Sequence, residues 1–187
     1  MTDSVFRLAA VDPGESWCGL SEFLLRPAGG RYEAGCTDQS TRGRIVLLRA
    51  VTLEPSSLYR DIESMAPYLH HLVLERYSLY PWLAREQGYS ELETAQCVGV
   101  VKYICSRADV PVTLQDAKKN LKEGRSRAQK AGFKMKDRVL GSGRFKYRGP
   151  DFDLPGKPHR RDACSHGVQW AATSPGSPLL TRRQAVR

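Results

Sequence analysis

The chain has 187 residues, enough for one domain with a sizeable core, and its apolar and charged fractions of 41% and 26% are ordinary for a globular protein. Its net charge of +9 is uneven: residues 1–109 hold 11 basic and 14 acidic residues, a net of −3, whereas residues 110–187 hold 18 and 6, a net of +12. Such a one-sided positive field favours nucleic acid or an anionic membrane surface as a partner. No stretch approaches the roughly 18–20 apolar residues of a membrane span, and no signal peptide is recognised. The five cysteines form no C-x-x-C pair, which favours reduced thiols in a cytoplasmic protein over a zinc site.

Short apolar runs and turn residues predict the elements of the first half of the chain. Residues 5–11 and 17–25 are expected to form two strands of a hairpin, and the β-rich run 44–53 a third strand. Apolar residues at helical spacing predict a helix over 58–69. Residues 71–75 form another short apolar run, which ends in an acid.

The second half begins with a predicted helix over 90–107 and a short strand over 110–115. The apolar side of that helix fits either a dimer surface or burial within the same subunit. A basic helix is expected near 116–131, followed by a mobile loop. A last helix is expected over about 158–172, and a loose basic tail over 174–187. The element order is therefore β-β-β-α-β-α-β-α, which predicts an α/β fold.

Three acidic residues stand out in this order. Asp12 and Glu75 each end an apolar strand, and Asp162 lies in the first turns of the last helix, with His159 and His166 on the same helical face. If the two strands are neighbours, these carboxylates converge, and crowded carboxylates are tolerable around hard divalent cations such as Mg²⁺ or Mn²⁺. Taken singly, Asp12 and Glu75 are each more often a turn or solvated residue than a ligand, Asp162 is explained as a helix-start residue, and His166 is more often a packed histidine. The joint pattern is what indicates a metal-dependent nuclease.

Residues 116–161 form a second candidate region, because they carry 15 Lys or Arg residues interleaved with aromatic residues. Basic side chains beside aromatic ones suit phosphate contacts combined with stacking on exposed bases. The alternative is an ordinary solvated charge run. The candidate DNA-binding residues are Lys118, Lys119, Lys122, Arg125, Arg127, Lys130, Lys134, Lys136, Arg144 and Lys146.

These motifs resemble those of the RuvC-type Holliday junction resolvases, a family within the ribonuclease H-like superfamily. The likeness spans residues 5–172, and its Asp-Ala-x-x-His ending is most similar to phage-encoded members. It is carried by Val11-Asp12-Pro13-Gly14, Leu72-Val73-Leu74-Glu75 and His159-Arg160-Arg161-Asp162-Ala163.

The resemblance implies a ribonuclease H-like mixed sheet flanked by helices, a homodimer, and two Mg²⁺ or Mn²⁺ ions at each active site. It implies Asp12, Glu75 and Asp162 as metal ligands and catalytic residues. His159, at a position where the family has an acid or a histidine, is the fourth candidate metal ligand and catalytic residue, which ligates a cation or orients the attacking water. We therefore expect one nuclease domain over residues 1–173, in a bacterial or phage-infected cell.

The predicted function is hydrolysis of phosphodiester bonds in Holliday junctions and other branched DNA, by a two-metal mechanism that leaves 5′-phosphate ends. The long basic region 120–157 leaves strict junction specificity open. One alternative is another ribonuclease H-like nuclease, acting in RNA processing or as a transposase. The other is a non-catalytic nucleic-acid-binding protein, and a membrane-surface role ranks third.

Overall fold

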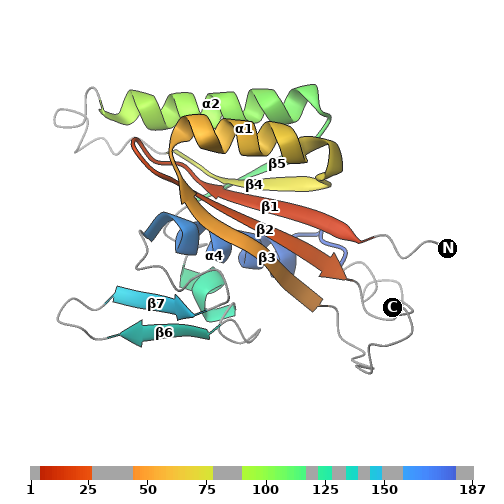
Figure 1. Cartoon of the computed structure of the whole chain (residues 1–187). Helices are drawn as coiled ribbons and strands as arrows, with labels where there is room; N and C mark the ends of the chain where they lie inside the picture. Colours follow the sequence, from red (N-terminus) through yellow and green to blue (C-terminus); the bar gives the residue numbers. More distant parts are fainter. Residues whose placement is uncertain are drawn as a thin grey trace.

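A mixed five-stranded sheet forms the centre of the molecule (Figure 1). The computed structural model describes residues 5–26, 44–77, 90–116, 122–127, 134–138, 144–148 and 158–179. The strands are β1 (Phe6–Asp12), β2 (Cys18–Arg26), β3 (Arg44–Leu53), β4 (His71–Glu75) and β5 (Val112–Gln115), in the order β3-β2-β1-β4-β5. β1 pairs antiparallel with β2 and parallel with β4, and β5 is parallel to β4. The expected α/β fold with a mixed sheet is confirmed.

Helices cover both faces of this sheet. One face carries α1 (Pro55–Met65), the 3₁₀ turn η1 (Ala66–Tyr68) and α2 (Ser90–Arg107), and the other carries α4 (Pro158–Thr173). Strand β1 is buried on both sides: Ala9 and Val11 pack under α1 and α2, while Leu8 and Ala10 pack under α4. Side chains alternate along a strand, so Asp12 projects to the α4 face.

The register of the parallel strands brings their polar ends together. Val11 of β1 lies opposite Leu74 of β4, so Asp12 and Glu75 occupy the next positions on neighbouring strands. Glu75 in turn lies opposite Gln115, the last residue of β5. Because the carboxyl ends of parallel strands meet at one edge of a sheet, Asp12, Glu75 and Gln115 end the three parallel strands β1, β4 and β5 side by side.

Helix α4 lies very close to the sheet beside this edge. Gly19 of β2 pairs with Asp12, and a Cβ built on Gly19 would lie 2.1 Å from the backbone oxygen of His159. The Ser21 hydroxyl donates to the backbone oxygen of Arg160 at 3.2 Å. Glycine and serine on β2 therefore let the first turn of α4 rest on the strand, and this contact carries His159 and Asp162 to the end of β1.

The basic region differs from the expectation. Residues 122–127 are helical, within the predicted basic helix near 116–131. Residue 116 is not helical, and residues 117–121 and 128–131 lie outside the described part. A mobile loop was expected to follow the basic helix, and this prediction is wrong for two segments. β6 (Lys134–Arg138) and β7 (Arg144–Arg148) are strands that pair as an antiparallel two-stranded sheet. Basic residues take every second position in both strands, and in β7 they alternate with aromatic residues, Arg-Phe-Lys-Tyr-Arg. This is the period-two pattern of a strand, and the glycines around it concealed that pattern.

The predicted loose tail, residues 174–187, is described only as far as residue 179. Within the described part Ser177 is buried, and its hydroxyl donates to the backbone oxygen of Ala171 at 2.6 Å. The apolar side of α2 is buried in its own subunit, with Val101 and Cys105 fully covered, so packing explains it. None of the described helices is long and apolar enough to span a membrane.

Candidate active site

Asp12 is a buried carboxylate at the end of β1. It is 6% exposed, and its Oδ2 lies 2.7 Å from Nδ1 of His159 on α4. Burial, with the nearby charges of Glu75 and Asp162, raises the pKa of Asp12 to about 7, although the hydrogen bond from His159 opposes the shift. The same hydrogen bond raises the pKa of His159 above its usual range. Asp12 is therefore costly to ionise without a cation beside it.

A buried histidine of α4, His166, holds the side chain of Glu75. Its Oε2 accepts a hydrogen bond from Nε2 of His166 at 2.8 Å, and Nδ1 of the same ring lies 2.9 Å from Oε1 of Gln115. His166 is 0% exposed, in agreement with its interpretation as a packed histidine. Gln115 was not among the predicted site residues, although it ends a strand in the same way as the two acids do.

Asp162, one turn into α4, is paired with guanidinium groups. Arg125 of the helical segment 122–127 lies 2.6 Å from its Oδ1, and Arg161 lies 3.4 Å from the same oxygen. Close packing supports this contact, because a Cβ built on Gly124 would lie 2.1 Å from the backbone oxygen of Ser165 on α4. The basic segment thus rests directly on the helix that carries Asp162.

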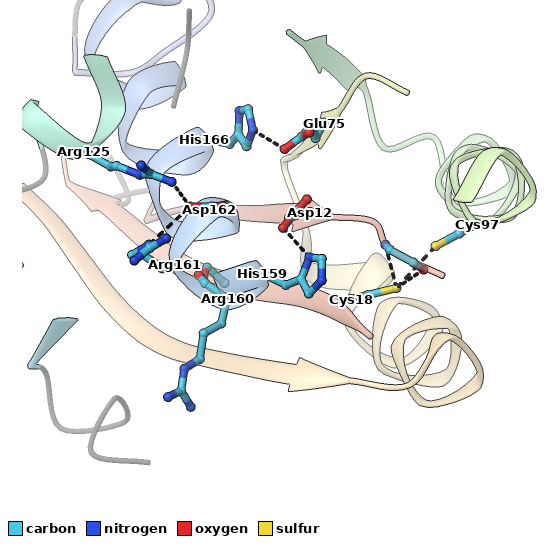
Figure 2. Close-up of polar contacts among 12 residues, drawn as sticks. Asp12, Cys18, Glu75, Cys97, Arg125, His159, Arg160, Arg161, Asp162 and His166 are labelled. Atoms are coloured by element: carbon cyan, nitrogen blue, oxygen red, sulfur yellow. Dashed lines mark hydrogen bonds and ion pairs between the residues drawn. The ribbon is translucent and has the colours of Figure 1, made fainter. Parts of the chain in front are cut away.

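The three acids gather at one place without forming a preformed cage. Figure 2 shows Asp12, Glu75 and Asp162 around the ends of β1 and β4 and the first turns of α4. The charges of Glu75 and Asp162 both act on Asp12, which requires them to lie near it. In the described part of the chain, however, no group of three or more His, Cys, Asp or Glu side chains is arranged to hold a metal ion as it stands. Each acid is engaged by a different His or Arg side chain.

The chemistry of these donors nevertheless suits a hard divalent cation. Carboxylate oxygens and one imidazole nitrogen are ligands that Mg²⁺ and Mn²⁺ accept. A cation among Asp12, Glu75 and Asp162 would offset the burial, and the smaller repulsion from Glu75 and Asp162, that raise the pKa of Asp12. It would also compete with Arg125 for Asp162. The residues present therefore fit a divalent cation once their side chains turn toward it.

A sulfur contact lies behind the Asp12 turn. The thiol of Cys18 exchanges hydrogen bonds with the backbone of Gly14 at 3.4 and 3.5 Å, and its Sγ lies 3.7 Å from that of Cys97 on α2. The hydrogen bond from Cys97, followed by that from Gly14, lowers the pKa of Cys18 to about 7. The four described cysteines are free and buried, as expected of reduced thiols. The contacts of Cys18 with Gly14 and Cys97 hold in place the turn that follows Asp12.

Comparison with solved structures identifies the architecture. A structure of RuvC from Thermus thermophilus matches with a TM-score of 0.52 and 15% identity, over 89% of this chain and 93% of that chain. The chain has a RuvC-like fold. A second structure, T. thermophilus RuvC in complex with a Holliday junction substrate, matches with a TM-score of 0.51 and 15% identity, over 89% and 92% of the two chains. No protein-family model matches the sequence, and no match to a curated protein was found.

The RuvC-like fold confirms the ribonuclease H-like sheet that the sequence motifs imply. At 15% identity the likeness establishes the fold alone. Both structures come from T. thermophilus, so the narrower expectation of a phage-encoded relative stays a prediction.

The predicted DNA-binding residues are only partly described in this RuvC-like fold. Lys122 and Arg127 are exposed on the segment 122–127, whereas Arg125 turns inward to Asp162. Figure 1 shows β6 and β7 on the α4 side of the main sheet. Lys134, Lys136, Arg144 and Lys146 belong to those strands, and Lys118, Lys119 and Lys130 lie outside the described residues. The described basic segments and the acids therefore share one side of the molecule.

Proposed function

We propose that the chain is a divalent-cation-dependent endonuclease that hydrolyses phosphodiester bonds in four-way DNA junctions and related branched DNA. The observation that carries the proposal is the buried carboxylate of Asp12 at the end of β1, with Glu75 at the end of the neighbouring strand and Asp162 in the first turns of α4. Burial and the charges of these two acids raise its pKa. A protein that only bound nucleic acid would gain nothing from three carboxylates facing a phosphate backbone. The RuvC-like fold supports the same proposal, because one matched structure is RuvC in complex with a Holliday junction substrate.

In this proposal Asp12, Glu75 and Asp162 hold the cations, with Mg²⁺ or Mn²⁺ as the ions and two at each site. When bound, the cations lower the pKa of a coordinated water and neutralise charge on the reacting phosphate. His159 holds Asp12 through its Nδ1. That contact orients one carboxylate oxygen and leaves the other available. The expected products are 5′-phosphate and 3′-hydroxyl ends.

The basic residues would bind the DNA backbone on the same side. Lys122 and Arg127 are exposed on a segment that contacts α4 through Gly124, so phosphates bound there lie near the acids. Contacts of this kind release counterions, so affinity should fall linearly with the logarithm of salt concentration. A flat salt response would remove the basic region from the proposed site.

The test is a cleavage assay on four synthetic substrates: a four-way junction, a flap, a linear duplex and an RNA–DNA hybrid. We expect wild-type protein to cut the junction with a saturable Mg²⁺ dependence, and Asp12→Asn to bind the junction without cutting it. Glu22→Gln is the matched control, because this acid on β2 pairs with Arg7, away from the sheet edge, and should cut as wild type. Cleavage by Asp12→Asn would contradict the proposal.

The same substrates separate the other hypotheses. Preference for the hybrid would favour a ribonuclease H-like enzyme of RNA processing. Binding without cutting and without Mg²⁺ dependence would favour a non-catalytic nucleic-acid-binding protein. The homodimer implied by the family likeness is part of the proposal, since a two-fold protein fits a two-fold junction. Light scattering of the free protein tests it, and a strictly monomeric protein would contradict it.

A further inference from the structure

His166 connects three elements at the acidic edge of the sheet. It lies on α4, four residues after Asp162, and its two ring nitrogens reach the last residues of β4 and β5. Nε2 donates to Oε2 of Glu75 at 2.8 Å (Figure 2). Nδ1 of the neutral ring is then an acceptor, and it lies 2.9 Å from the side-chain amide of Gln115, whose N–H donates to it when the amide is turned by 180°. Glu75 and Gln115 are themselves opposite each other in the sheet. One buried ring therefore links the helix to both strand ends.

Glu75 differs from the other two acids in the partner that holds it. His159 and Arg125, which contact Asp12 and Asp162, are partly exposed, whereas His166 is fully buried. Its neighbours are locked as well, because Cys164 and Val168 are core residues and Gly167 packs against the ring of Phe23. A ring packed so closely has a single orientation, and it therefore fixes where one oxygen of Glu75 lies.

We propose that His166, supported by Gln115, is a positioning residue that holds Glu75 ready for a divalent cation. This inference rests on the proposed function, because it assigns a role to a residue behind one of the proposed ligands. A glutamate side chain has several rotamers, and binding a cation requires it to adopt one of them. The hydrogen bond to Oε2 selects that rotamer before the cation arrives and leaves Oε1 to bind. Outer partners of ligands typically change metal affinity about 10- to 100-fold when they are removed.

The chain supplies a matched control in His71. This histidine lies at the opposite end of β4 and on the same face of the sheet, and its Nε2 lies 2.8 Å from Oγ1 of Thr113 on β5. Its ring stacks on Trp170 of α4 with centroids 4.3 Å apart. His71 therefore joins the same three elements without touching an acid. If His166 served packing alone, replacing either histidine would change Tm and the Kd for Mn²⁺ by similar amounts.

The experiment compares His166→Phe with His71→Phe, since phenylalanine keeps the ring and removes both nitrogens. Mn²⁺ binding to the free protein is measured from the electron paramagnetic resonance signal of unbound Mn²⁺, and Tm by calorimetry. We expect both variants to lose a few degrees in Tm. We expect the Kd for Mn²⁺ to rise about 10- to 100-fold in His166→Phe and less than about 3-fold in His71→Phe.

Two further variants keep the inference falsifiable if His166→Phe does not fold. His166→Gln places an amide N–H where Nε2 stands and should restore Mn²⁺ binding to within about 3-fold of wild type. Gln115→Leu should weaken binding about 3- to 10-fold, because it releases the ring. In cleavage assays His166→Phe should raise the Mg²⁺ concentration for half-maximal rate more than it lowers the rate at saturating Mg²⁺.

The outcomes separate this inference from the proposed function. If wild type binds Mn²⁺ and His166→Phe binds it equally well, or if His71→Phe weakens binding as much, the positioning role is wrong and the nuclease proposal stands. If folded Gln115→Leu binds Mn²⁺ as wild type, the support from Gln115 is wrong. If wild type shows no saturable Mn²⁺ binding, both proposals are wrong.

Discussion

His159 and Asp12 are 147 residues apart in the chain, and their side chains meet at 2.7 Å between Nδ1 and Oδ2. The contact joins the first turn of α4 to the end of β1. It partly offsets the burial that raises the pKa of Asp12 to about 7, and it raises the pKa of His159 in return. Each group binds its proton more tightly in the folded protein than in the unfolded chain, so the contact links folding to pH.

Replacing Asp12 by Asn should therefore stabilise the metal-free protein at neutral pH. The folded pKa of Asp12 lies near 7 and the unfolded value near 3.8, so its contribution to stability is fully present below pH 3.8 and is lost as pH rises toward 7. The raised pKa of His159 acts in the same direction, but only above about pH 6.5, where the unfolded ring loses its proton. We expect the stability of wild type relative to Asp12→Asn to fall between pH 4 and pH 7, by at most about 1.4 kcal/mol per pH unit for each proton.

Urea unfolding of both proteins at half-unit steps of pH, in the presence of a chelator, measures this difference. Taking the difference between the two proteins cancels groups that both retain. Addition of Mg²⁺ at pH 8 should stabilise wild type and leave Asp12→Asn unchanged. A difference that stays constant from pH 4 to pH 7 would show that Asp12 titrates as an ordinary aspartate.

His71 predicts a pH dependence of the opposite sign at the other end of the sheet. Burial lowers the pKa of His71 from 6.5 to about 4, so the unfolded chain takes up a proton first as pH falls. The stability of wild type relative to His71→Phe should fall as pH drops from about 6.5 to 4. Above pH 7 only the lost hydrogen bond to Thr113 remains, at a cost of about 1 kcal/mol.

Urea unfolding at pH 4.5, 6 and 7.5 measures the predicted change for His71. The His166 comparison is therefore best made above pH 7, where His71 is neutral. Equal differences at the three pH values would show that His71 is not shielded from protonation.

Gly19→Ala should lower the cleavage rate strongly while it lowers the stability of the fold only moderately. The new Cβ would lie 2.1 Å from the backbone oxygen of His159, so the start of α4 must move away from β2. Overpacking of this kind costs about 1–3 kcal/mol. A displacement of about 1 Å at His159 and Asp162 should lower the cleavage rate on a four-way junction about 100-fold.

Gly99→Ala is the control for Gly19, because Gly99 lies on α2 with nothing within 4 Å of a built Cβ. It should keep full activity and gain about 0.5–1 kcal/mol, since alanine favours a helix over glycine. Thermal unfolding and single-turnover cleavage of both variants check the pair. Full cleavage by a folded Gly19→Ala protein would show that α4 tolerates the shift.

The fold was predictable because strand β1 carries a strong local signal. The continuous apolar run Leu8-Ala9-Ala10-Val11, which ends in Asp12, is typical of a strand buried on both faces, and the run ending in Glu75 repeats that signal. The boundaries of β3 and α2 match those expected, because β3 is rich in β-branched residues and α2 begins with a helix start signal and carries apolar residues at helical spacing. The convergence of Asp12 and Glu75 followed from placing both strands in one sheet, which the parallel register supports.

The partners of the acids could not be predicted from local patterns. The pairing of Glu75 with His166 depends on how α4 crosses the sheet, and this in turn depends on glycine at position 19. Likewise, the contact of Arg125 with Asp162 joins segments 37 residues apart. In the sequence Arg125 is one basic residue among many, and only the fold distinguishes it.

Arg125 and Arg127 should therefore respond differently to the same substitution. Arg125 lies 2.6 Å from Asp162, where it supplies the positive charge that a cation would supply, whereas Arg127 is exposed. Arg125→Gln should tighten Mn²⁺ binding about tenfold, or about 1.4 kcal/mol, because the cation no longer competes with a guanidinium. Arg127→Gln should leave Mn²⁺ binding unchanged and lower the slope of junction affinity against salt by about 1. Metal titration and filter binding at several salt concentrations measure both, and weaker Mn²⁺ binding in Arg125→Gln would show that Arg125 orients Asp162 for the cation instead of competing with it.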